Sequence, residues 1–125
     1  MKNLFLLLAA GNGFLAVMFG AFGAHALAKR LSPAMLGVYQ TGVQYQMFHV
    51  VALLAVGFLL QRGNDSPLLP WSGYLFAAGI VLFSGSLYGL SLSGIRALGM
   101  ITPVGGVAFL AGWALLFVGL LGHKQ

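Results

Sequence analysis

The sequence predicts an all-α integral membrane protein: four transmembrane helices in a compact bundle, with a short interfacial helical segment before the second span. Hydrophobic residues make up 60% of the chain and charged residues 6%, against roughly 25% charged residues in soluble domains. The charges also leave uncharged windows long enough for the ~20 residues that cross a bilayer. We therefore expect one transmembrane domain over residues 1–125, with spans at about 4–27, 42–61, 70–92 and 101–121.

The first apolar run is predicted to be a retained span, because it is longer than the ~7–15 apolar residues of a secretory signal. Small residues recur along it at steps of three and four, among them Gly13 and Gly20. Such a stripe lets another helix approach closely. Asn12 lies beside the stripe near mid-span, and we expect it to form an interhelical hydrogen bond rather than to bind a ligand.

The second helix is predicted to begin with Ser32 as N-cap and Pro33 at its first position, directly after the charged pair Lys29 and Arg30. Its first turns are expected to run along the membrane interface. The helix would then descend into the bilayer near Gly42.

Beyond that point, polar and small side chains share one helical face, which we expect to look into the protein. The face consists of Gly42, Tyr45, Gln46, His49, Leu53 and Val56. Gln44 points nearly the opposite way. A histidine and a glutamine are costly in hydrocarbon unless they find partners, so Gln46 and His49 are candidate site residues.

Glycine patterns in the last two spans indicate further helix packing. The third span is separated from the second by residues 63–67, whose composition predicts a turn. In the third span, Gly85 and Gly89 form a G-x-x-x-G pair that favours close packing, either within the chain or against another copy. The fourth span is predicted to begin at Thr102, and it repeats a glycine every seven residues. These glycines are Gly105, Gly112 and Gly119.

Alternating spans bring polar side chains from all four predicted helices to one side of the membrane. The candidates for a shared pocket or polar cluster are His25, Gln46, His49, Ser84, Tyr88 and Thr102. We expect His25 and His49 to share one environment. The alternative is a packed network in which these groups only satisfy one another, because an unpaired polar group in lipid costs several kcal/mol.

Four motifs, taken together and in order, resemble a known family. They occupy residues 20–26, 41–49, 83–88 and 101–106 and read GAFGAHA, TGVQYQMFH, FSGSLY and ITPVGG. The chain resembles the domain-of-unknown-function 423 family (DUF423), small four-span bacterial inner-membrane proteins. The resemblance covers nearly the whole chain. It implies a four-helix membrane fold, and it implies no activity and no catalytic residues.

Composition excludes several kinds of function. The chain has no cysteine, so disulfides, thiolate metal sites and cysteine nucleophiles are excluded. No basic cluster exceeds two residues, so we expect no nucleic-acid partner. Asp65 is the one acidic residue and lies in a predicted loop, which argues against a carboxylate metal site or proton relay. We therefore expect no enzyme activity, no cofactor and no metal.

Three functions remain, and the first is favoured. It is a structural or accessory membrane subunit that packs through its glycine seams, as a homo-oligomer or in a larger membrane complex. The alternative is an oligomeric small-molecule binding or transport unit with a polar pocket in one half of the membrane. The least favoured is a haem or metal protein with His25 and His49 as ligands, since paired histidines on facing helices build such sites.

The chain is predicted to lie in the bacterial inner membrane, with the lipid bilayer as its first partner. Basic residues are balanced between the two sides, so charge alone does not orient it. Lys2, Arg62 and Lys124 lie on the terminal side, and Lys29, Arg30 and Arg96 on the other. We expect both termini in the cytoplasm, from the even number of spans and because similar proteins carry added basic residues after the second and fourth spans.

Overall fold

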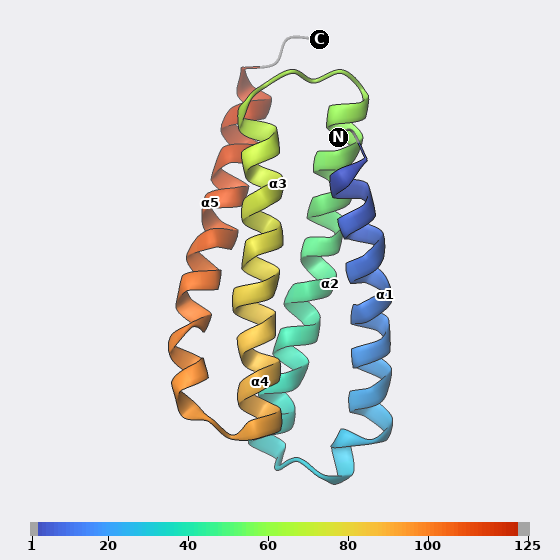
Figure 1. Cartoon of the computed structure of the whole chain (residues 1–125), viewed down its shortest axis with the longest axis vertical. Coiled ribbons are helices and arrows are strands. Elements are labelled where there is room, and N and C mark those ends of the chain that lie inside the picture. The colour runs from blue at the N-terminus through green and yellow to red at the C-terminus, as the bar shows by residue number, and fades with distance from the viewer. Residues whose placement is uncertain (1–2, 123–125) are drawn as a thin grey trace.

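The chain folds into long antiparallel helices (Figure 1), and the computed structural model describes residues 3–122. Within that range, four helical segments are long and apolar enough to cross a membrane. They are Leu4–Lys29, Pro33–Gln61, Leu68–Ser93 and Arg96–Leu121. No strand occurs in the described residues, so the predicted all-α membrane class is confirmed. Lys2 and Lys124, two of the expected surface anchors, lie outside the described residues.

Short irregular turns connect or interrupt the long helices. In chain order the elements are α1 (Leu4–His25), the 3-10 turn η1 (Leu27–Lys29), α2 (Pro33–Gln61), α3 (Leu68–Gly79), the π-helical turn η2 (Ile80–Ser84), α4 (Gly85–Ser93), the 3-10 turn η3 (Arg96–Met100) and α5 (Thr102–Leu121). The third span is therefore α3, η2 and α4 in one continuous run.

The start of α2 agrees with the sequence, and its course does not. The Ser32 side chain accepts a hydrogen bond from the Met35 backbone N–H at 3.2 Å, and Pro33 occupies the first turn. The expected change of direction near Gly42 is wrong, because α2 is one unbroken helix of 29 residues (Figure 1). A Cβ added at Gly42 would lie 2.8 Å from the Tyr88 ring, so the glycine lets that ring pack against the α2 backbone.

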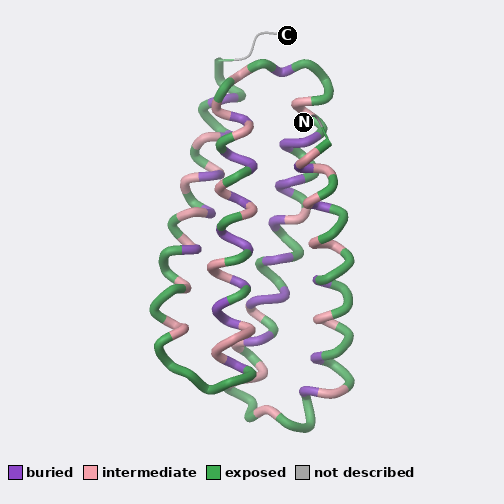
Figure 2. The backbone as a smooth tube through the Cα atoms, in the orientation of Figure 1, coloured by how far each residue is buried: buried purple, intermediate pink, exposed green. Residues whose placement is uncertain are grey.

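The helices are arranged around a central pair. Packing is most extensive between α1 and α2 and between α3 and α5, and α2 also packs on α3 and α4. Consequently α1 and α5 lie on opposite sides of the pair formed by α2 and the third span (Figure 1). Buried residues concentrate on that pair, as Figure 2 shows. Phe5, Leu53, Val56, Phe76 and Phe109 are among the residues of the main apolar core.

The glycines spaced seven residues apart along α5 allow its backbone to pack directly against the third span. A Cβ added at Gly105 would lie 2.8 Å from Leu82 C and Phe83 Cα, inside the π-helical turn η2. A Cβ added at Gly112 would lie 2.8 Å from the Phe76 ring, so this glycine lets the ring pack against the α5 backbone. A π-helical turn adds a residue to the helix and widens it locally, and here the absent side chain of Gly105 leaves room for it.

The other predicted packing glycines behave differently from one another. Cβ atoms added at Gly13 and Gly20 would meet valine methyl groups of α2 at 3.6 and 3.4 Å, which is ordinary contact. One added at Gly119 would lie 3.2 Å from the Ser66 hydroxyl, and one at Gly89 would lie 2.8 Å from the Leu98 side chain. Gly85 is exposed, and a Cβ added there would meet no atom of another part of the described chain within 4 Å. The expected packing role for Gly85 within the chain is therefore wrong, because the Leu98 side chain covers Gly89 and no described side chain covers Gly85. A role for Gly85 in contacts between copies stays a prediction.

The described charges lie at the two ends of the helices. Lys29, Arg30 and Arg96 are exposed at one end, and Arg62 and Asp65 at the other. The start of α1 and the end of α5 share the second of these ends (Figure 1). The apolar surface between the two ends is the surface that faces lipid.

Candidate functional site

A chain of side-chain hydrogen bonds joins α1, α2 and α4 around Gln46. Gln46 Nε2 donates to Asn12 Oδ1 at 2.9 Å, and the Tyr88 hydroxyl donates to Gln46 Oε1 at 2.7 Å. Asn12 Nδ2 in turn donates to the Leu8 carbonyl oxygen at 2.9 Å. The interhelical hydrogen bond expected of Asn12 is confirmed. The Gln46 amide is engaged at both its donor and its acceptor atom.

Two hydrogen bonds made by hydroxyl groups of the third span lie near this chain of hydrogen bonds. Ser84 Oγ donates to the Gly42 carbonyl oxygen at 2.7 Å and so ties the π-helical turn to α2. The Ser86 and Thr102 hydroxyl oxygens lie 2.5 Å apart, which links α4 to the start of α5. In lipid, such bonds replace the water that would otherwise satisfy these groups.

His49 belongs to a separate cluster between α2 and α5. Trp113 Nε1 donates to His49 Nε2 at 3.0 Å, and His49 Nδ1 lies 2.8 Å from the Tyr45 carbonyl oxygen. An indole N–H can only donate and a carbonyl can only accept. The imidazole must therefore be neutral, with its proton on Nδ1. Its ring stacks on Phe109, with centroids 3.6 Å apart and planes 8° from parallel.

This geometry bears directly on the haem and metal hypothesis. A histidine ligand needs a free lone pair on one ring nitrogen. In His49 one nitrogen accepts the Trp113 N–H and the other carries the proton given to Tyr45 O. Residues 3–122 also contain no group of three or more His, Asp, Glu or Cys side chains that could hold a metal ion. His49 thus acts as a structural link between two helices.

His25 does not join either cluster, so the expectation that it shares an environment with His49 is wrong. It is exposed at the last residue of α1. The buried residues of α1 include Ala9, Ala16 and Gly23, which recur every seven positions and face α2. Two residues beyond Gly23, the helix has turned by roughly 200°, and His25 points outward. The rise per residue predicted its depth but said nothing of its direction.

Other side chains near the clusters were misplaced or missed. Tyr45, expected on the inward face, is 42% exposed and packs its ring on Phe83 with centroids 4.5 Å apart. Tyr39 is buried over Gly23 and donates its hydroxyl to the Phe19 carbonyl oxygen at 2.6 Å, a link between α2 and α1 that the sequence did not reveal. The hydrogen bond from Trp113 to His49 was not predicted from the sequence. An indole N–H in an apolar helix needs an acceptor, and that need was the available signal.

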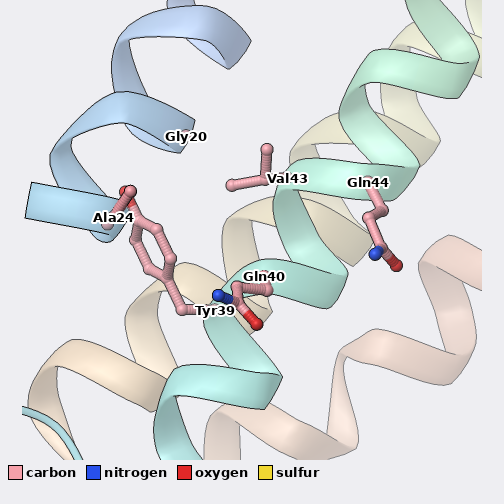
Figure 3. A pocket seen from close by; sticks show the side chains of 7 residues that line it. Gly20, Ala24, Tyr39, Gln40, Val43 and Gln44 are labelled. Atoms are coloured by element: carbon pink, nitrogen blue, oxygen red, sulfur yellow. The ribbon is translucent and has the colours of Figure 1, made fainter. Parts of the chain in front are cut away.

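Two shallow hollows lie on the lipid-facing surface beside α2. The first, of about 360 Å³, lies between α1 and α2 (Figure 3) and is lined by Gly20, Gly23, Ala24, Tyr39, Gln40, Val43 and Gln44. The second, of about 440 Å³, lies between α2 and α5, and its aromatic lining includes Tyr45, Phe48, Phe83, Phe109 and Trp113. Gln46 and Tyr88 line neither hollow. Of the six residues of the predicted polar cluster, His49 alone lines either hollow, in the aromatic wall of the second. Neither hollow is therefore the shared polar pocket that the sequence suggested.

Comparisons with known proteins agree with this membrane architecture. A family model described as "Protein of unknown function (DUF423)" matches residues 19–106. The UPF0382 inner membrane protein YgdD of Escherichia coli (strain K12) is 49% identical over 96% of this chain and 91% of its own length. The UPF0382 membrane protein YwdK of Bacillus subtilis (strain 168) is 48% identical over 93% of this chain and 94% of its own length. No solved structure matches the chain.

Proposed function

Since the chain belongs to the DUF423 family of membrane proteins, we propose that it is a structural or accessory membrane subunit and not an enzyme. One observation carries the proposal: the interior polar side chains use their hydrogen-bonding atoms on one another. Gln46 is engaged at both ends of its amide, and His49 at both ring nitrogens. A substrate could use these atoms only by breaking one of the hydrogen bonds that they make here.

The same bonds supply a reason for the polar groups to be present. All of them except the contact from His49 to the Tyr45 carbonyl oxygen join two helices, and helices have no hydrophobic drive to associate within lipid. Tyr88 ties α4 to α2, and Trp113 ties α5 to α2. A net gain of about 1 kcal/mol for each bond suits a rigid scaffold. The interior therefore serves to hold the helices in place, and the outer surface carries the function.

On this proposal the chain works as part of an assembly, either with copies of itself or within a larger complex of the bacterial inner membrane. Its lipid-facing surface carries many exposed large apolar side chains, such as Phe14, Val81 and Leu110, and the two hollows beside α2 offer places for a partner. We further propose that both termini lie in the cytoplasm. The common end of α1 and α5 supports a single side for both (Figure 1).

A second candidate function is the binding of a small apolar molecule. The hollow between α2 and α5 has a volume of about 440 Å³, within the roughly 300–1,000 Å³ of ligand pockets. Its aromatic lining favours a planar or hydrophobic ligand. This differs from the polar pocket expected from the sequence, because His49 is the one predicted polar residue in the lining and both its ring nitrogens are hydrogen-bonded.

Extraction of the protein from its membrane directly into lipid nanodiscs, followed by native mass spectrometry, tests the proposal. We expect particles heavier than one 13.1-kDa chain, through further copies of the chain or through other membrane proteins. A Tyr88→Phe variant should unfold more easily while keeping the same assembly mass. A protein found solely as a monomer would overturn the accessory-subunit proposal. A copurified small molecule that is lost from a Phe109→Ala variant would favour the second candidate.

A further inference from the structure

The outward face of α2 carries a regular stripe of exposed residues. At alternating steps of three and four it runs through Gly37, Gln40, Gln44, Met47, Val51 and Leu54, all of them exposed. We call this stripe the α2 seam. Steps of three and four are the a and d spacing with which two parallel helices pack in a left-handed coiled coil.

Gln44 is the anomalous member of the α2 seam. It follows the N-cap Ser32 by twelve residues, or about 18 Å at 1.5 Å per residue, and precedes Arg62 by about 27 Å. A hydrocarbon layer of ~30 Å centred on this helix would begin about 8 Å from either end, so Gln44 lies about 10 Å inside it. An amide exposed to lipid at that depth is costly without a partner.

Among the described residues 3–122, none gives Gln44 such a partner. The side-chain hydrogen bonds of the neighbouring part of α2 are made by Thr41, Gln46 and His49. Within residues 3–122, Gln44 makes none. Gln46, two residues further on, has the opposite orientation and is satisfied at both ends. In this arrangement the exposed Gln44 amide is open to a partner outside the chain.

A second copy of the chain provides that partner directly. Copies inserted with the same orientation place Gln44 at the same depth, next to its own counterpart across a two-fold axis normal to the membrane. An amide has both a donor and an acceptor, so two glutamines are mutually complementary. A polar residue in the seam of parallel helices also sets their register.

The surface beside the α2 seam leaves room for a second copy. The hollow between α1 and α2 has Gly20, Gly23 and Ala24 in its lining, with Gln40 and Gln44 from neighbouring turns of α2 (Figure 3). Small residues allow a neighbouring helix to approach closely in lipid. The hollow can thus receive side chains of the second copy while the two Gln44 amides meet.

We infer that two copies of this chain associate through the α2 seam, with their Gln44 amides hydrogen-bonded to each other inside the membrane. This inference rests on the proposed function, since it names the surface through which the subunit assembles. The association is parallel and two-fold symmetric, and α2 of one copy lies against α2 of the other.

Cysteine crosslinking tests the face, because the natural chain has no cysteine. Gln44→Cys and Val51→Cys variants, oxidised in native membranes, are expected to form disulfide-linked dimers on non-reducing gels. Val81→Cys is the matched control, since Val81 is a similarly apolar and exposed residue of the third span. The Val51→Cys variant keeps the amide intact, so it tests the face independently of how the Gln44 variants fold.

The hydrogen bond is tested by Gln44→Leu, which keeps the bulk of the side chain and removes both polar functions. We expect dimerisation, measured by fluorescence transfer between labelled copies in liposomes, to weaken about three- to thirtyfold, the range for interhelical hydrogen bonds in membranes. Gln44→Asn should retain most of the affinity. Equal dimerisation of the leucine variant, or crosslinking at Val81 in place of Val51, overturns the inference. Native particles that still exceed one chain would then leave the proposed function standing.

Discussion

Alanine in place of Gly105 is expected to loosen the contact between α5 and the third span. The added methyl group would lie 2.8 Å from two backbone atoms of the π-helical turn, Leu82 C and Phe83 Cα. Backbone atoms cannot move aside by a change of rotamer, so the helices must separate locally. Overpacking of this kind costs about 1–3 kcal/mol.

The neighbouring Gly106 supplies a matched control for that magnitude. A Cβ added there would meet the nearest atoms, on the Phe83 ring, at 3.8 and 3.9 Å, which is ordinary contact. Both substitutions gain the same preference of alanine over glycine in a helix, up to about 0.5–1 kcal/mol. The difference between Gly105→Ala and Gly106→Ala therefore isolates the packing cost, which we expect to be about 1–3 kcal/mol.

The assay is unfolding of the purified variants in mixed micelles, as the fraction of denaturing detergent is raised and helicity is followed by circular dichroism. Gly105→Ala should unfold at a lower fraction of denaturing detergent than the natural protein, and Gly106→Ala at the same or a higher one. If the two variants unfold together, the backbone contact between α5 and η2 does not stabilise the fold, and the packing argument fails.

Three further predictions concern the polar clusters and the orientation. Phenylalanine at His49 leaves the Trp113 N–H without its acceptor and should lower the unfolding free energy by about 1–3 kcal/mol, whereas phenylalanine at the exposed His25 should change it by less than about 0.5 kcal/mol; equal losses in the micelle assay would contradict the pairing. Phenylalanine at Tyr88 should cost about 1 kcal/mol, and its effect should largely vanish in a Gln46→Leu background, so additive losses would argue against their hydrogen bond. A periplasmic reporter fused after the last residue should be inactive, and activity there would reverse the proposed orientation.

The polar residues illustrate how far sequence reasoning reached. Gln46 and Asn12 were each expected to need a partner, because an amide in hydrocarbon is costly, and they bond to each other. The sequence did not pair them, since helices can rotate about their axes without changing the depth of any residue. The same freedom explains the error at His25, which faces outward at the end of α1. Depth follows from counting residues, and direction follows from packing.

The course of the backbone was also only partly predictable. The cap at Ser32 is local chemistry between residues three apart, and it was identified correctly. The unbroken course of α2 through Gly42 was not predicted, and the Tyr88 ring that packs against this glycine comes from a distant part of the chain. The π-helical turn at Ile80–Ser84 left no sequence signal that we recognised. This π-helical turn lies where Gly105 of α5 packs against the third span.

The sequence by itself determined the class of protein and its helical spans, because the thickness of a bilayer and the cost of charge within it act on each segment separately. The tertiary structure alone decided which faces meet. It paired His49 with Trp113 and Gln46 with Asn12 and Tyr88, and it left Gln44 on the outer surface. Those outcomes depend on helix rotation and close packing among all the spans together, and no single segment contains that information.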